Sequence, residues 1–100
     1  MSYRVFYAEQ FRVQLVEQLK YFAHEGTPQE RISNWLNGML LMMDSLEELP
    51  LRFSVAETES GIEGITLRRV VFGAHLIFYR VDDEHEEVQV YGFRHGARLS

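Results

Sequence analysis

The sequence predicts an α+β fold in which an N-terminal strand precedes a helical hairpin and then a mostly antiparallel sheet of three to four strands. Three observations lead to this prediction. Apolar residues recur at helical spacing through the first half of the chain, Pro50 ends that pattern, and runs rich in branched and aromatic residues follow it. At 100 residues the chain has room for a single domain, residues 1–100, with one hydrophobic core.

A change of period predicts the first strand and the first helix. Residues 3–7 read Tyr-Arg-Val-Phe-Tyr, which is typical of a strand. From Glu9 onward, four apolar residues recur at spacings of four, four and three and share one helical face: Phe11, Leu15, Leu19 and Phe22. Ala8 is a poor N-cap, so we expect no side-chain cap at the start of this helix.

The second helix is predicted from a start signal and a stop signal. Thr27 and Glu30 have the spacing of a capping box, and Pro28 stands between them at the first helical position. The helix is expected to run to about Leu49, where Pro50 stops it. Its apolar stripe is expected to comprise Ile32, Leu36, Met39, Met43 and Leu46. Because the link between the two helices is short, they should form an antiparallel hairpin.

The second half of the chain is predicted to be β-structure interrupted by one loop, Thr58 to Gly61. Strands are expected at 52–57, where the alternation is weak, and at 65–72, 75–81 and 88–93. The turn Gly73-Ala74 has two residues, which fixes the register of the strands that it joins. The predicted cross-strand pairs are Phe72 with His75, Val70 with Ile77 and Arg68 with Tyr79.

The composition excludes several classes of protein. The chain has no cysteine, so disulfides, thiolate metal sites and cysteine nucleophiles are ruled out. The histidines show no ligand spacing, and neither a metal nor a cofactor is expected. No apolar run approaches the ~20 residues that span a bilayer and no leader segment is visible, so we expect a cytoplasmic protein with no membrane partner. The net charge of −5 argues against affinity gained by neutralising many phosphates.

The predicted sheet is locally basic despite the acidic total. From Gly64 to Val81 the only charged side chains are Arg68, Arg69 and Arg80. Acidic residues gather instead in the connecting segments that flank these strands. The three arginines can pair with those carboxylates or contact an anionic target, and the sequence leaves both alternatives open.

Three features of the chain together resemble a known family. The segment from Leu46 to Leu51 closes on Pro50, the hairpin reads Leu-Arg-Arg-Val before its turn and Leu-Ile-Phe-Tyr-Arg-Val after it, and the chain ends in His95-Gly96-Ala97-Arg98. This combination resembles the ParE/RelE toxin superfamily over essentially the whole chain, and its ParE-like members more closely. The resemblance implies the toxin of a type II toxin-antitoxin system, which causes growth arrest and plasmid stabilisation.

Two activities are known in that superfamily. RelE-like members are endonucleases that cut messenger RNA in the ribosome, whereas ParE-like members poison DNA gyrase and are not nucleases. As a nuclease, the chain would use Arg68 and Arg69 to hold phosphate and His95 to transfer protons. For binding a target, the resemblance points to Arg68, Arg69, Arg80, His95 and Arg98. His95 can equally do no more than cap the last strand by hydrogen bonding.

Several features favour gyrase over messenger RNA as the target. The resemblance to RelE-like nucleases implies a basic chain with lysines in the sheet, yet the only lysine here is Lys20 on a helix. No tyrosine follows Tyr91, although many RelE-like members use one near the C-terminus. A third alternative stays open, in which the chain is a non-toxic remnant that only binds an antitoxin.

The resemblance also implies a cognate antitoxin that folds around the toxin to form a hetero-oligomer. The candidate residues for this contact lie on the second helix: Trp35, Met39, Met42 and Met43. Methionines can form an adaptable binding groove. Because the same residues fall at helical spacing, ordinary core filling is the alternative that the pattern favours.

Overall fold

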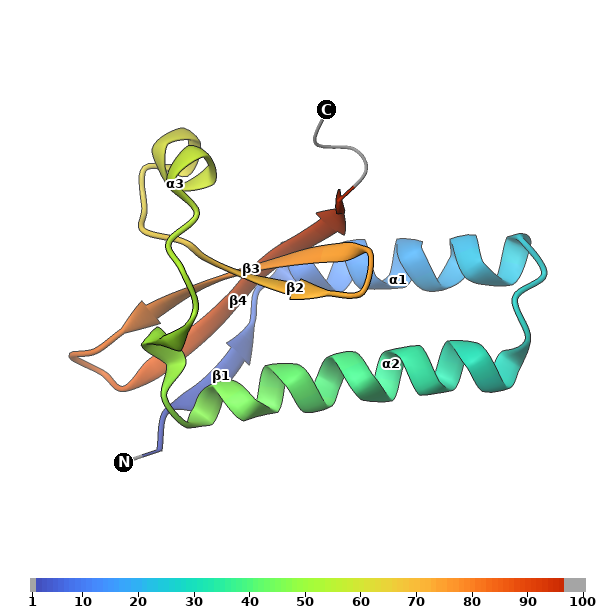
Figure 1. The fold of residues 1–100 in the computed structure, drawn as a ribbon, viewed down its shortest axis with the longest axis horizontal. Helices are drawn as coiled ribbons and strands as arrows, with labels where there is room; N and C mark the ends of the chain where they lie inside the picture. The colour runs from blue at the N-terminus through green and yellow to red at the C-terminus, as the bar shows by residue number, and fades with distance from the viewer. Residues whose placement is uncertain (1, 97–100) are drawn as a thin grey trace.

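The structure is a computed structural model that describes residues 2–96 of the chain (Figure 1). Its elements in chain order are β1 (Arg4–Tyr7), α1 (Glu9–His24), α2 (Gln29–Asp44), α3 (Glu57–Glu63), β2 (Arg68–Phe72), β3 (His75–Asp82) and β4 (Glu87–His95). Two single turns of 3₁₀ helix, η1 (Ser45–Glu47) and η2 (Pro50–Arg52), connect α2 to α3. The predicted order of strand, helical hairpin and sheet is confirmed.

The four strands form one sheet in the order β1-β4-β3-β2. β1 runs parallel to β4 and the other two pairings are antiparallel, so the sheet is mixed and mostly antiparallel. The predicted register of the β2–β3 hairpin is confirmed: Phe72 pairs with His75, Val70 with Ile77 and Arg68 with Tyr79. In β4 the register shifts by one residue, because Phe78 pairs with Gly92 whereas Tyr79 pairs with Val90. Tyr91 is therefore the extra residue of a β-bulge.

α1 and α2 lie antiparallel on one face of the sheet and enclose the main core (Figure 1). Phe11 is buried there and the rest of the α1 stripe is half-buried, which confirms the predicted face of that helix. The fully buried residues of this core include Met39, Met43, Leu46, Val70, Ile77, Tyr79, Val88 and Val90. Burial of such side chains stabilises the fold by about 1.5–3 kcal/mol each before entropy is subtracted.

α3 covers part of the opposite face of the sheet (Figure 1). It packs with a second, smaller cluster of buried residues: Ala56, Leu67, Leu76 and Phe78. The predicted loop at Thr58 to Gly61 is therefore wrong, because these residues are helical. The Ser60 hydroxyl bonds to both the amide and the carbonyl of Leu67, and this contact ties α3 to the start of β2.

Two other predictions near the helix ends are wrong. α2 begins at Gln29 with no side-chain cap at its start, whereas a capping box with Thr27 was predicted. The Thr27 amide donates to the Phe22 carbonyl at 2.9 Å, so Thr27 belongs to the turn that ends α1. The predicted strand at 52–57 is absent from the described residues, where Val55 forms only an isolated bridge with Arg68.

α2 ends at Asp44, before the predicted end at about Leu49, and the chain continues as the 3₁₀ turn η1. Leu49 adopts a left-handed backbone with φ of 49° immediately before Pro50. The Arg52 guanidinium donates to the carbonyls of Ser45, Glu48 and Leu49 and so holds this turn together. Over residues 2–96, no helix combines the length and the apolar character that a bilayer crossing requires.

Candidate functional site

The adjacent residues Arg68 and Arg69 point to opposite faces of the sheet, because side chains alternate along a strand. Arg68 lies on the helix-covered face, where its guanidinium donates to the Phe53 carbonyl at 2.6 Å and to the Leu51 carbonyl at 3.3 Å. Nearby, the Tyr79 hydroxyl donates to the Pro50 carbonyl, and burial raises the pKa of Tyr79 to about 12. Arg68 therefore holds the segment after Pro50 against the sheet.

Arg69 and Arg80 are both exposed on the opposite face. Arg69 pairs with Phe78, and Arg80 follows Phe78 by two residues on the same strand. The two arginines are thus diagonal neighbours, with roughly 7–8 Å between their positions. Within the described part of the chain, neither guanidinium takes part in an ion pair. We call Arg69 and Arg80 the open arginine pair.

Two carboxylates lie in the same hollow as Arg80, but each has another partner. Asp82 and Glu87 line this hollow together with Phe6 and Gln89. The Arg4 guanidinium binds Glu87 at 2.9 Å, and the His85 ring binds Asp82 at 2.7 Å. The hydrogen bond from His85 lowers the pKa of Asp82. The positive charge of Arg80 is therefore not matched by a carboxylate bound directly to it.

His95 lies at the other end of the sheet. It pairs with His75 across the β3–β4 ladder, and the two rings are 5.2 Å apart. The His75 ring is 4% exposed and lies 5.3 Å from the indole of Trp35. Arg98, the last of the predicted target-binding residues, lies outside the described residues.

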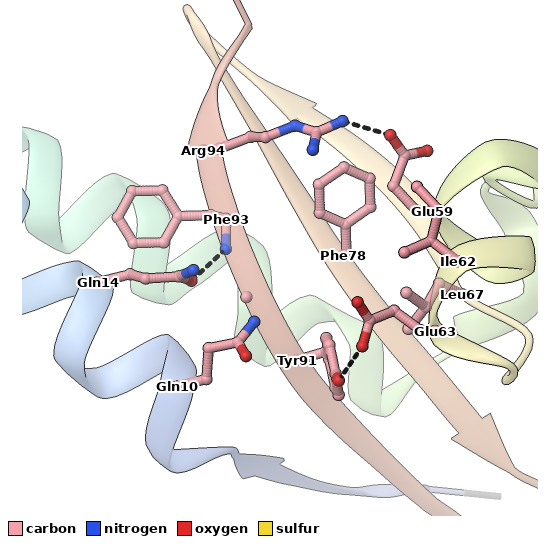
Figure 2. A pocket seen from close by; sticks show the side chains of 11 residues that line it. Gln10, Gln14, Glu59, Ile62, Glu63, Leu67, Phe78, Tyr91, Phe93 and Arg94 are labelled. Carbon is pink, nitrogen blue, oxygen red and sulfur yellow. Dashed lines mark hydrogen bonds and ion pairs between the residues drawn. The ribbon is translucent and has the colours of Figure 1, made fainter. Parts of the chain in front are cut away.

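The structure also contains a pocket that the sequence did not predict. It opens between α1 and α3 at the C-terminal half of β4, and Figure 2 shows its lining side chains. The cavity has a volume of about 150 Å³. Its lining residues include Gln10 and Gln14 from α1, Glu59, Ile62 and Glu63 from α3, and Phe78, Tyr91, Gly92 and Arg94 from the sheet. We call it the α1–α3 pocket.

On one side of this pocket β4 lacks a neighbouring strand. β1 pairs only with the first part of β4, from Glu87 to Val90, so the C-terminal half of β4 is left without a strand partner on that edge. The Gln14 side chain accepts a hydrogen bond from the Phe93 amide at 2.9 Å and takes the place of a strand partner. Gly92 permits this approach, because an added Cβ would lie 2.8 Å from Gln14 Oε1 and 2.9 Å from Gln10 Nε2. A side chain at position 92 would therefore push the two glutamines away from the strand.

The other side of the pocket is held by two contacts from α3 to β4 (Figure 2). Glu59 binds the guanidinium of Arg94, whose carbon lies 5.2 Å from the centroid of the Phe78 ring. Glu63 accepts a hydrogen bond from the Tyr91 hydroxyl, and this bond raises the pKa of Tyr91. The pocket thus has two carboxylates and one guanidinium, so negative charge exceeds positive charge among its side chains.

The four residues predicted to bind an antitoxin differ in accessibility. Met39 and Met43 have no exposed surface, and they pack in the main core beneath the sheet. Trp35 and Met42 are half-buried and keep some accessible atoms. A partner cannot reach the two buried methionines while the core stays closed, so for them the core-filling alternative holds.

One group of potential metal ligands comes together in the turn between β3 and β4. Ligand atoms of Asp82, Glu84 and His85 lie within 4.8 Å of one another. The sequence had shown no such spacing. Because Asp82 already binds the amide and the ring of His85, these contacts account for the shape of the turn.

Comparisons with known proteins agree with the fold described above. The chain is similar to the toxin-antitoxin complex RelBE2 from Mycobacterium tuberculosis, with a TM-score of 0.64 and 20% identity over 95% of this chain and 99% of that one. It is also similar to the archaeal RelE-RelB complex from Pyrococcus horikoshii OT3, with a TM-score of 0.55 and 20% identity over 99% of this chain and 100% of that one. A search of curated proteins found no match.

A family profile gives the more specific result. The profile described as the ParE toxin of the type II toxin-antitoxin system, parDE, matches residues 5–100. The match spans every strand and helix except the first residue of β1. The chain therefore belongs to the ParE toxin family of type II toxin-antitoxin systems.

Proposed function

We propose that this toxin poisons DNA gyrase by binding to it and does not itself cut nucleic acid. The proposal is carried by the wide separation of the side chains that an RNA-cleaving site would need. Such a site requires a base, an acid and a cation around one phosphate. Arg68, Arg69 and His95 were the candidates for these roles.

The strand register keeps those three side chains apart. Arg68 pairs with Tyr79, whereas His95 pairs with His75, which precedes Tyr79 by four residues on β3. At about 3.3 Å per residue, this is a separation of roughly 13 Å along the sheet. Arg69 points to the opposite face from Arg68, so the two guanidinium groups cannot hold one phosphate together.

The open arginine pair is the surface that we assign to the target. Two exposed guanidinium groups at this spacing suit an acidic protein surface or a DNA backbone. His95 and Arg98 at the end of the chain are proposed as a second contact. Arg68 serves the first contact only indirectly, because it fixes the chain beside β2.

A cognate antitoxin is the proposed partner that holds the toxin inactive in the cytoplasm. Both solved structures named above are toxin-antitoxin complexes, which supports a hetero-oligomer of this kind. Trp35 and Met42 are the accessible members of the predicted contact on α2. Co-expression with the product of the adjacent open reading frame should raise the soluble yield and the melting temperature, and unchanged values would contradict this partnership.

Purified gyrase tests the choice of target. The toxin should inhibit ATP-dependent supercoiling of relaxed plasmid or should trap linear DNA that detergent and protease release. A parallel reaction contains translating ribosomes, and there the messenger RNA should stay intact. Cleaved message together with active gyrase would establish the nuclease alternative.

Induction in bacteria tests whether the chain is toxic at all. We expect growth arrest accompanied by DNA damage signals. Substitutions His95→Ala and Arg98→Ala should each weaken the arrest while the melting temperature stays unchanged. Absence of arrest with the unmodified chain would contradict the proposal and would favour the antitoxin-binding remnant.

A further inference from the structure

The α1–α3 pocket lies beside the open arginine pair but carries the opposite charge. Phe78 forms part of the pocket wall and is the cross-strand neighbour of Arg69. Leu67 also lines the pocket and precedes Arg69 by two residues on the same face of the sheet. Directly opposite residues lie about 5 Å apart, so a chain that enters the pocket comes within reach of Arg69.

The polar atoms of the pocket favour a cation. Glu59 and Glu63 each use one oxygen, to bind Arg94 and Tyr91 respectively. Among residues 2–96 the other oxygen of each carboxylate makes no further hydrogen bond or ion pair. With two negative charges against the single positive charge of Arg94, the pocket repels a phosphate and attracts an ammonium or guanidinium group.

The apolar atoms of the pocket suit the methylene stem of a basic side chain. Ile62 stands at the rim with 75% of its surface exposed, and the Phe78 ring forms part of the wall. Lysine and arginine bury their stems against such surface while their charged ends bind acceptors. A cavity of about 150 Å³ has room for one side chain of this size.

We propose that the α1–α3 pocket receives one lysine or arginine side chain of the cognate antitoxin, and that the antitoxin segment anchored there covers the open arginine pair. This inference rests on the proposed function, because it assigns a mode of neutralisation to the face that binds the target. Val71, 63% exposed and two residues beyond Arg69, offers the same segment an apolar contact. The antitoxin thereby covers the open arginine pair while its own basic side chain is bound by the acidic α1–α3 pocket.

A pair of variants on one helix tests the anchor. Glu63→Gln removes a negative charge from the pocket, whereas Glu57→Gln removes the same charge from the exposed start of α3. The dissociation constant with the antitoxin encoded by the adjacent open reading frame is measured by calorimetry at low and high salt. We expect Glu63→Gln to weaken binding by roughly tenfold or more and to reduce its salt dependence, with Glu57→Gln within about twofold of wild type.

A third variant separates the pocket charge from the docking of α3. Tyr91→Phe removes the hydrogen bond to Glu63 but keeps the carboxylate, so it should bind the antitoxin at least as tightly as wild type. If Tyr91→Phe loses affinity as Glu63→Gln does, the contact between α3 and β4 matters rather than the charge, and the proposal is wrong. Equal affinities for Glu63→Gln and Glu57→Gln would also overturn it.

The same preparations distinguish this inference from the proposed function. Wild-type toxin that inhibits gyrase, together with antitoxin binding that is insensitive to Glu63→Gln, overturns the pocket assignment alone. Wild-type toxin without effect on gyrase, together with weakened antitoxin binding by Glu63→Gln, overturns the proposed target alone. A loss of gyrase inhibition by Glu63→Gln with unchanged antitoxin binding would assign the pocket to the target and contradict the inference.

Discussion

The sheet face under α1 and α2 and the face under α3 differ in how they hold their arginines. On the first face, Arg68 donates to main-chain carbonyls beside a fully buried core. On the second face, Arg94 is bound by Glu59, while Arg69 and Arg80 have no ion pair within residues 2–96. A guanidinium fixed to the main chain contributes to the fold, whereas an exposed and unpaired one is available to a partner. We therefore expect Arg68 to matter for stability, and Arg69 and Arg80 on the second face to matter for binding the target.

The largest expected difference between the two faces is in packing. Ile77 is fully buried against the helices, whereas Ile62 on α3 is 75% exposed. Ile77→Ala should lower the free energy of unfolding by about 2–5 kcal/mol, because it leaves a cavity in the main core. Ile62→Ala should change it by less than about 0.5 kcal/mol. Urea unfolding measures both variants. Equal losses of unfolding free energy would contradict the view that the helix-covered face contributes more to stability than the α3 face.

The two adjacent arginines of β2 should separate stability from toxicity. Arg68→Ala removes the bonds to the carbonyls of Leu51 and Phe53 and should cost about 1.5–3 kcal/mol of unfolding free energy. Arg69→Ala should cost less than about 0.5 kcal/mol but should weaken gyrase inhibition. Thermal unfolding and the supercoiling assay are run on both proteins. A stable Arg68→Ala variant would show that its bonds do not hold the segment.

The left-handed residue before Pro50 should give a smaller effect of opposite sign. Leu49 is 76% exposed and has φ of 49°, so its side chain strains the backbone and contributes little packing. Leu49→Gly should raise the free energy of unfolding by roughly 0.5–1 kcal/mol, because glycine adopts this conformation freely. Leu51→Gly, in the following 3₁₀ turn, should lower it. If both substitutions destabilise equally, the backbone at Leu49 is not strained.

The smallest expected effect concerns the exposed turn between β3 and β4. The hydrogen bond from His85 holds the pKa of Asp82 below its ordinary 3.8. Because the folded-state pKa is the lower one, this contribution to stability is present above pH 3.8 and is lost as the pH falls through the folded value. In His85→Ala, NMR titration of Asp82 should give a higher pKa that stays below 3.8, because the backbone amide of residue 85 still donates to the carboxylate. An unchanged, low pKa would mean that another group stabilises the carboxylate.

Sequence patterns predicted the helix-covered face well for physical reasons. The apolar period of α1 and α2 reflects burial against a sheet, and a two-residue turn leaves the β2–β3 hairpin a single register. The pattern also identified Met39 and Met43 as candidates either for antitoxin binding or for core filling. Both side chains are fully buried, which agrees with core filling. Local spacing was sufficient in these cases because the relevant contacts repeat along one element.

The α3 face could not be predicted in the same way. The segment Glu57–Glu63 has glycine at 61 and no apolar period, so nothing local distinguishes it from a loop. Its partners Tyr91 and Arg94 lie 28 and 35 residues further along the chain. An acidic run of this kind usually indicates a solvated turn, and only the folded sheet brings it against Arg94. The α1–α3 pocket depends on these distant contacts and therefore gave no signal in the sequence.

Gyrase inhibition by two matched double variants tests the division of the two faces most directly. One variant carries Arg69→Ala and Arg80→Ala, and its control carries Arg12→Ala and Arg31→Ala on the exposed sides of the two long helices. Both lose the same charge, so a general electrostatic effect would lower inhibition equally. We expect the first to require on the order of a hundredfold more protein for half-inhibition, and the control to match wild type. Equal inhibition by both double variants would contradict the assignment of recognition to the open arginine pair.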